Sequence, residues 1–379
     1  MDIDNPALRL SAVLMLFVVL STALRPAFKY GSGMPLWLIY IGICLVIFFL
    51  LTKINNARLE SYVLGIGLTI YVFLSAYFYP IADALKETRQ GQDQDDCTIL
   101  VASQLFRFDF PYDQTSYFGN PCSPLPGAIL PYAPFVLLDA FWLANPVILV
   151  TLAMLSTRFS GKTRATVLGL LLTLAVPQTL ELSIAGSDLI FMGFGLLAGA
   201  LLLERSLEDP KYLWFATLVL ALVASSRVST PILGLVFIIW LWLNHRQKFF
   251  RFFTLFFGVG GLPTILIFLW NPSEFSPLHL LSKGASLVPG YSYGLMVLLT
   301  LLSLIYVALE KRIRSNAVTF LSIGFSAHLI FLSFGDLVFN RGFDFATWEG
   351  ANYLSLIIPI WSVAIFRIVF RQPKCKIHN

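Results

Sequence analysis

The sequence predicts an all-α, polytopic integral membrane protein with about 12 transmembrane helices (11 to 13). Its 379 residues are 57% hydrophobic and only 12% charged, and the mean hydropathy is +0.78. An ordinary soluble domain carries about 25% charged residues and cannot bury so much apolar surface. Apolar stretches of about 20 residues, the length that crosses ~30 Å of hydrocarbon as a helix, recur from residue 8 to residue 370.

In chain order, the first apolar stretch runs from Leu8 to Leu24. No small-x-small cleavage site follows it, so we expect a retained span instead of a signal peptide. The other eleven stretches are centred near residues 43, 70, 140, 173, 195, 218, 236, 261, 300, 324 and 360. Without an internal repeat, they predict one membrane-embedded domain over residues 1–379.

Two regions do not fit one straight crossing. Residues 128 to 156 contain Asp139 and the pair Asn145-Pro146, so we expect either one kinked span or a re-entrant piece followed by a short span. Residues 211 to 244 would rise ~51 Å as a single helix, which is too long to cross once. They predict a helical hairpin with Ser225-Ser226-Arg227 at its tip.

The distribution of basic residues predicts the orientation. If the N-terminus is cytoplasmic, 18 of the 26 Lys and Arg residues fall in inner joints, as the positive-inside rule requires. We therefore expect both termini in the cytoplasm and the protein in the plasma (inner) membrane. The inner residues are Arg9, Lys53, Arg58, Arg158, Lys162, Arg164, Arg205, Lys211, Arg246, Lys248, Arg251, Lys311, Arg312, Arg314, Arg367, Arg371, Lys374 and Lys376.

Residues 81–125 form an acidic loop on the predicted outer side. They carry seven of the 21 acids, which are Asp83, Glu87, Asp93, Asp95, Asp96, Asp109 and Asp113. Apolar residues after Asp96 predict a short interfacial helix that starts at Asp95 or Asp96. One of these aspartates could cap that helix, or it could act as a base, because two adjacent carboxylates at a polar boundary can have their pKa values driven apart.

The four cysteines lie at Cys44 in a span, Cys375 in the basic tail, and Cys97 and Cys122 in the acidic loop. The last two could form a disulfide if the loop faces an oxidising compartment, or remain two thiols. Neither a zinc spacing nor a histidine cluster occurs in the sequence.

Several further polar residues share the predicted outer side. Arg227 has no acidic neighbour in sequence and lies between two apolar runs, so it either reaches the lipid headgroups or binds a partner such as a phosphate. Asp188, Asn340, Arg341 and Glu349 could line the same cavity, or each could be a solvated joint or a cap. For Asp139 and Glu181, nearer the hydrocarbon, we expect hydrogen bonds between spans.

With these residues in place, the chain resembles the GT-C superfamily of membrane glycosyltransferases. Asp95-Asp96, a short helix and Phe110-Pro-Tyr112 are similar to the family's acidic pair, helix and turn, and Ser123-Pro-Leu-Pro-Gly127 resembles the segment that follows. The hairpin tip at Arg227 and the last span, Tyr353-Leu-Ser-Leu-Ile-Ile-Pro359, also resemble family features. The acidic loop follows the third predicted span, whereas the family typically places it after the first.

The resemblance implies transfer of a hexosyl or pentosyl group, on the extracytoplasmic side, from a polyprenyl-phosphate-linked sugar to a glycan, lipid or protein acceptor. It assigns Asp95 and Asp96 as catalytic candidates, with one of them as the general base, and Arg227 and Arg341 as candidates that bind the donor phosphate. Asp188, Tyr112, Asn120 and Glu349 are candidates for substrate binding. No cofactor is required, although a divalent cation could bind the acidic loop, and the partners are membrane lipids, not nucleic acid.

Three other functions remain open at this stage. A twelve-span secondary transporter or lipid flippase would have two related halves and polar residues near the midplane, neither of which the sequence shows. A polysaccharide polymerase or ligase would use several arginines of a late outer loop, of which only Arg341 is present. A non-catalytic scaffold would use the acidic loop to dock a partner.

Overall fold

The computed structural model describes residues 6–53, 56–88, 92–161, 163–310, 313 and 316–370. Every regular element over these ranges is helical, and the extended pairing among them is an isolated bridge between Thr115 and Pro121. The predicted all-α class is thus confirmed. The chain termini and Cys375 lie outside the described residues, as do Lys162, Lys311, Arg312, Arg314, Arg371, Lys374 and Lys376.

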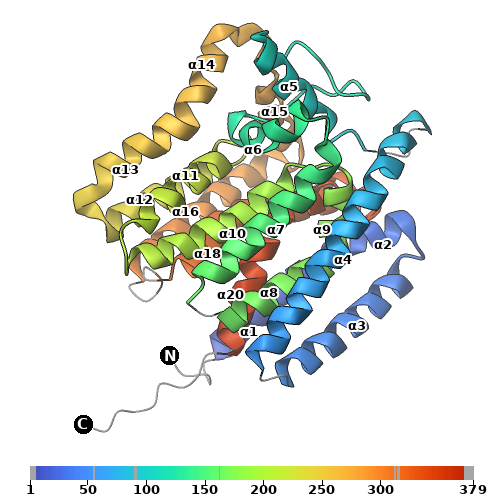
Figure 1. Cartoon of the computed structure of the whole chain (residues 1–379), viewed down its shortest axis with the longest axis vertical. Helices are drawn as coiled ribbons and strands as arrows, with labels where there is room; N and C mark the ends of the chain where they lie inside the picture. Colours follow the sequence, from blue (N-terminus) through green and yellow to red (C-terminus); the bar gives the residue numbers. More distant parts are fainter. Residues whose placement is uncertain are drawn as a thin grey trace.

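The helices are drawn in Figure 1. In the first half of the chain they are α1 (Pro6–Ser21), α2 (Leu24–Tyr30), α3 (Met34–Lys53), α4 (Ala57–Ala84), η1 (Leu85–Thr88), α5 (Asp96–Arg107), α6 (Pro126–Leu137), η2 (Phe141–Leu143), α7 (Ala144–Phe159), α8 (Thr163–Ala175), α9 (Pro177–Ile184) and α10 (Leu189–Ser206).

In the second half they are α11 (Tyr212–Ala224), α12 (Pro231–Asn244), η3 (Arg246–Lys248), α13 (Phe249–Phe256), η4 (Phe257–Gly261), α14 (Leu262–Trp270), η5 (Pro272–Glu274), η6 (Ser276–Leu278), α15 (His279–Ser286), η7 (Gly290–Ser292), α16 (Tyr293–Leu309), α18 (Ala317–Gly335), η8 (Asp336–Asn340), α19 (Gly350–Leu354) and α20 (Ile358–Val369).

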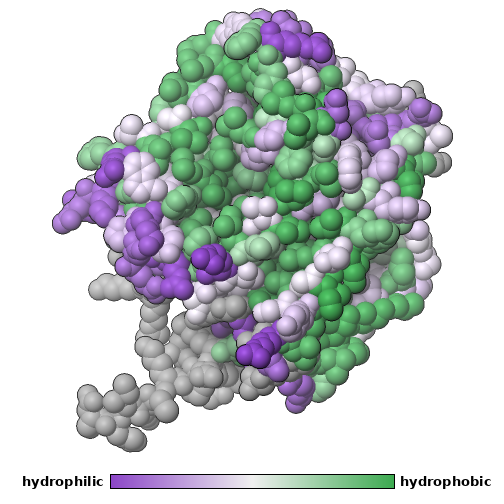
Figure 2. All heavy atoms as spheres, in the orientation of Figure 1, coloured by the Kyte–Doolittle hydropathy of each residue, from purple (hydrophilic) through white to green (hydrophobic). Residues whose placement is uncertain are grey.

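Seven described helical segments are long and apolar enough to cross a membrane, and the bent pair α8 and α9 raises the number to eight. The expected count of about 12 is not reached on length, because five further apolar helices are shorter: Met34–Leu50, Pro126–Leu137, Tyr212–Ala224, Pro231–Asn244 and Ile358–Val369. Hydrophobic residues cover most of the face seen in Figure 2, and hydrophilic residues gather toward its edges.

Helix α10 lies at the centre of the bundle and packs against α7, α11, α18 and α20. Its residues are almost all buried, and two glycines allow the neighbours to come close: a Cβ at Gly193 would lie 2.8 Å from the carbonyl oxygen of Ser355, and one at Gly199 would lie 2.6 Å from Leu220. The N-terminus of α10 follows Asp188, so this rigid central helix fixes the position of that carboxylate.

The structure shows how the two irregular regions, residues 128 to 156 and 211 to 244, fold. Residues 128 to 156 fold as the short helix α6, the turn η2 and then α7, so the chain is divided here into two helices and is not one kinked helix. The Tyr132 hydroxyl donates to Asn145 Oδ1 at 2.5 Å and ties α6 to α7. The hairpin expected over residues 211 to 244 is confirmed, because α11 and α12 are joined by a turn that contains Arg227.

Basic joints meet at one end of the bundle. Arg205, at the end of α10, donates through Nε to the carbonyl of Phe159 at the end of α7, and Arg367 near the end of α20 pairs with Glu204 at 2.7 Å. The loops around α5 and α15 lie at the opposite end (Figure 1). The structure therefore separates these basic joints from the acidic loop.

Candidate functional site

Helix α5 shapes the acidic loop. It starts at Asp96, as expected, and buries Val101 and Ala102 beneath the loop. A disulfide joins Cys97 on its first turn to Cys122, which resolves the alternative that the sequence left open. Asp95 precedes the helix but makes no side-chain capping bond. The simple N-cap interpretation of Asp95 is therefore wrong, and its carboxylate is engaged elsewhere.

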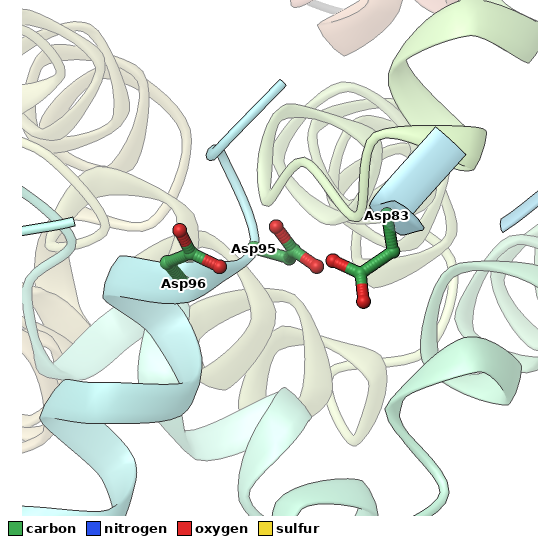
Figure 3. A group of neighbouring side chains, drawn as sticks. All are labelled: Asp83, Asp95 and Asp96. Atoms are coloured by element: carbon green, nitrogen blue, oxygen red, sulfur yellow. The ribbon is translucent and has the colours of Figure 1, made fainter. Parts of the chain in front are cut away.

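Three carboxylates converge where α4, η1 and α5 meet. Asp83, Asp95 and Asp96 each present an oxygen within 4.8 Å of the others, and Figure 3 shows the three side chains turned toward one another. The Lys86 ammonium lies among them, with Nζ at 2.6 Å from Asp83, 2.8 Å from Asp95 and 2.5 Å from Asp96. One buried cation thus offsets the repulsion among three anions.

Asp95 is the most enclosed of the three, with 2% of its surface exposed. The Tyr79 hydroxyl donates to its Oδ2 at 2.5 Å. Burial raises the pKa of Asp95 above its ordinary value, although the hydrogen bonds from Lys86 and Tyr79 act in the opposite direction. A carboxylate with a raised pKa is a stronger base, so this environment suits proton abstraction better than that of a solvated aspartate.

The position of Asp95 depends on Gly186, which lies three positions before the first residue of α10. Gly186 has φ of +66°, and a Cβ there would lie 2.5 Å from the Asp95 Cβ and 3.0 Å from Phe141. The backbone of this turn therefore passes directly against the Asp95 side chain.

Asp96 is more accessible, with 18% of its side chain exposed. Its Oδ2 accepts the backbone N–H of Tyr117 at 3.0 Å and so anchors the loop before Cys122. Asp95 and Asp96 are brought together around the same ammonium but face different surroundings.

An apolar cavity of about 330 Å³ lies between α2, α4 and α9. Asp83 and Asp95 line it, and most of the remaining wall is hydrocarbon and aromatic, from Pro26, Phe78, Tyr79, Ile81, Leu85, Pro177, Leu180 and Ile184. The cavity combines a wall suited to a lipid chain with two carboxylates of the cluster.

Glu181 closes one side of this cavity. Arg25 Nη1, Lys29 Nζ, the Tyr30 hydroxyl and Gln92 Nε2 all donate to its Oε1, at 2.7 to 3.2 Å. The expected bond between spans is present, since Arg25 lies in α2, within the candidate span Leu10–Tyr30, and Glu181 lies in α9. Its buried Oε2 has no hydrogen-bond partner among the residues that the structure describes, so this oxygen retains the capacity to accept a hydroxyl.

A second, polar cavity of about 410 Å³ adjoins the first. Arg227, Asn120 and Glu349 line it, together with Arg25, Asp93, Gln94, Ser116, Ser123, His279, Lys283, Asn352 and Tyr353. Gln92 lines both cavities. Gln92 therefore lies at the boundary between the apolar cavity and the polar cavity.

Arg227 has an acidic partner that its sequence neighbourhood does not show. Its Nε donates to Asp188 Oδ2 at 2.9 Å, its Nη2 to Asp188 Oδ1 at 2.5 Å, and its Nη1 to Ser123 Oγ at 3.1 Å. The pair raises the pKa of Arg227 although burial acts against it. Arg227 lines the polar cavity, and Asp188, fully buried, is its counterion.

Arg341 lies apart from Arg227. It pairs with Asp336 at 3.4 Å and with Glu349 at 3.3 Å, and it does not line the polar cavity. Glu349 also pairs with Lys283 at 2.9 Å. Glu349 is thus the link between the cavity and Arg341, and the two expected phosphate-binding arginines are not brought together at the wall of the polar cavity.

Two candidates from the acidic loop have different surroundings. Tyr112 is 3% exposed and its hydroxyl donates to the carbonyl of Pro124 at 2.8 Å, so it braces the loop and lines neither cavity. Asn120 lines the polar cavity and donates through Nδ2 to Asp93 at 3.0 Å.

A divalent cation fits the carboxylate cluster poorly while Lys86 is in place. Oxygen ligands of the three aspartates would suit Mg²⁺ or Mn²⁺, but the ammonium already contacts all three groups at 2.5 to 2.8 Å. A cation would have to displace it.

The sequence interpretation missed Lys86, Tyr79, Gln92 and Gly186, and it gave Glu181 only a structural role. Tyr79 and Lys86 lie four and three residues from Asp83, so helical spacing would have placed them near that carboxylate. Gly186 in Gly-Ser-Asp also indicated a special turn.

Comparison of the chain with protein-family models, with curated proteins and with solved structures finds no match.

Proposed function

We propose that this chain is a membrane glycosyltransferase of the GT-C type, which moves a hexosyl or pentosyl group from a polyprenyl-phosphate carrier to an acceptor hydroxyl. The observation that carries the proposal is the junction of the two cavities. Asp95 lines the apolar cavity, Arg227 lines the polar one, and Gln92 lines both. An amphiphilic donor with a lipid chain and a hydrophilic sugar phosphate needs such a junction.

The proposed path through the membrane has twelve crossings. It counts α1, α3, α4, α7, the bent pair α8 and α9, α10, α11, α12, the continuous run α13 to α14, α16, α18 and α20. The short helices α11, α12 and α20 then cross a thinned or partly hydrated region, and α6 stays in the outer half. This path places the basic joints in the cytoplasm and the acidic loop outside, and both termini are cytoplasmic.

In the proposed reaction, the oxygen of the acceptor hydroxyl attacks C1 of the sugar, and Asp95 accepts the proton of that hydroxyl. The bond between C1 and the phosphate oxygen breaks, the electron pair leaves with the polyprenyl phosphate, and the anomeric configuration inverts. Burial of Asp95 and its raised pKa favour the base role. Asp96 holds Lys86 and the loop around Tyr117, so we assign it to positioning.

Arg227 stabilises the leaving phosphate in this proposal. A guanidinium has five N–H donors, and three of the Arg227 contacts go to Asp188 and Ser123. Because Asp188 and Ser123 hold the guanidinium in place, its remaining N–H donors have fixed directions. Donors that are oriented in advance stabilise the charge that develops on the leaving phosphate without reorganisation. Arg341 has a supporting role through Glu349.

The experiment is a donor assay with the purified protein in lipid vesicles. A panel of short-chain polyprenyl-phosphate hexoses and pentoses is offered with a mixed glycan and lipid acceptor fraction, and release of polyprenyl phosphate is measured. We expect release of polyprenyl phosphate from at least one donor, and no transfer of the same sugar to the acceptor fraction when it is offered as a nucleotide sugar. No release from any member would contradict the proposal and favour a transporter, a flippase or a scaffold.

A further inference from the structure

The carboxylate cluster of Asp83, Asp95 and Asp96 holds its own cation. Lys86 Nζ lies 2.5 to 2.8 Å from an oxygen of each aspartate, and only 7% of the lysine side chain is exposed. An ammonium has three N–H donors, which equals the number of carboxylates around it. The lysine is therefore directed inward by the cluster and is not a solvated surface residue.

The chain geometry explains why the lysine reaches this position. Asp83 lies in the last turn of α4 and Lys86 in the following turn η1, three residues later. Asp95 and Asp96 arrive from the other side at the start of α5, whose first turn is fixed by the disulfide between Cys97 and Cys122. Two rigid segments thus enclose the ammonium.

The cluster would be strained without a cation. Like charges a few ångströms apart repel one another strongly when they are partly removed from water, and these carboxylate oxygens lie within 4.8 Å of one another. A divalent cation that takes oxygen ligands would offset the repulsion among these carboxylates. In this structure the ammonium of Lys86 supplies the positive charge.

We propose that Lys86 is a tethered substitute for a divalent cation, which fills the coordination position among Asp83, Asp95 and Asp96. It supplies the positive charge that keeps Asp95 oriented at the wall of the apolar cavity, and it is a positioning residue. Its contribution to sugar transfer rests on the proposed function, whereas its occupation of the cation position does not.

Removal of Lys86 should therefore open a metal site. In Lys86→Ala, the three aspartates lose their cation, and Mn²⁺ should bind at least about tenfold more tightly than to the wild type, since the competing charge is gone. Mn²⁺ is the probe, followed by electron paramagnetic resonance on the full-length protein in detergent. Lys86→Gln, of similar shape but neutral, should gain the same binding and guards against a folding defect of the alanine variant.

The matched control is Lys283→Ala, which removes a half-exposed lysine paired with Glu349. It should leave Mn²⁺ binding as in the wild type. Lys86→Arg keeps the charge and should also gain no binding.

Equal Mn²⁺ affinity of the wild type and the folded Lys86 variants would overturn the inference, as would folded variants that bind no Mn²⁺. The Mn²⁺ binding measurements do not depend on sugar transfer by the protein. A gain of Mn²⁺ binding without any sugar transfer would uphold the inference about Lys86 while contradicting the proposed function.

Discussion

Arg227 donates two hydrogen bonds to Asp188, from Nε to Oδ2 at 2.9 Å and from Nη2 to Oδ1 at 2.5 Å, and this carboxylate is fully buried. The two residues are 39 positions apart, one on the hairpin tip between α11 and α12 and the other before α10. The pair locks the hairpin onto the central helix, and it fixes the guanidinium at the wall of the polar cavity.

Asp188→Asn should destabilise the protein strongly. The substitution leaves the Arg227 guanidinium buried and without its counterion, and breaking one half of a buried pair costs about 3 kcal/mol or more. Thermal unfolding in detergent measures the change. Asp209→Asn, in an exposed pair with Lys211, is the control and should unfold like the wild type. An Asp188→Asn protein as stable as that control would show that the pair is unimportant for the fold.

Gly186→Ala should lower transfer about 100-fold by displacing Asp95, since a small misplacement of a catalytic group has an effect of that order. A Cβ at this position would lie 2.5 Å from the Asp95 Cβ, and φ is +66°. The assay is release of polyprenyl phosphate. Gly65→Ala, a helical glycine with open space around its Cβ position, should keep full activity. Normal transfer by the Gly186 variant would show that the function of Asp95 does not depend on this turn.

The pH dependence of transfer should report Asp95. Burial raises its pKa above 3.8, and the base must be deprotonated, so the rate should rise as the pH increases through that raised value. The stability contribution has the opposite sign: the folded state binds this proton more tightly than the unfolded one, so stability declines as the pH rises from 3.8 through the folded pKa. An acidic limb in kcat/KM checks the first effect, and a limb at the pKa of a free aspartate would contradict it.

The proposed membrane orientation predicts opposite labelling of two exposed positions. Asp113→Cys in the acidic loop and Glu208→Cys at the basic end are made separately with Cys44→Ser and Cys375→Ser. A membrane-impermeant maleimide on intact cells should label the first and not the second, since the proposed path places the loop outside and the basic joint inside. Labelling of position 208 with protection of position 113 would reverse the topology.

The sequence predicted the features that depend on local pattern. Apolar stretches gave the helical class, the polar tip at Arg227 gave the hairpin, and the apolar residues after Asp96 gave α5. These depend on composition and periodicity within one segment, which a single sequence contains.

Long-range partners could not be predicted in this way. Asp188 and Arg227 are 39 residues apart, and Arg25 and Glu181 are 156 apart, so their pairing depends on how the helices pack. Arg341 was a second candidate for the donor phosphate, but its side chain pairs with Asp336 and Glu349. A capping role for Asp95 was one of two alternatives, yet the nearby ammonium of Lys86 is a stronger partner for its carboxylate than a helix N–H.

The central claim is that Asp95 is the base of a sugar transfer, and the most direct measurement compares Asp95→Asn with Asp96→Asn in the donor assay. Both variants should insert into the membrane, which detergent extraction and size-exclusion chromatography would verify. The account predicts that Asp95→Asn abolishes release of polyprenyl phosphate, while Asp96→Asn retains a measurable part of it. Equal wild-type activity of the two variants would contradict the account.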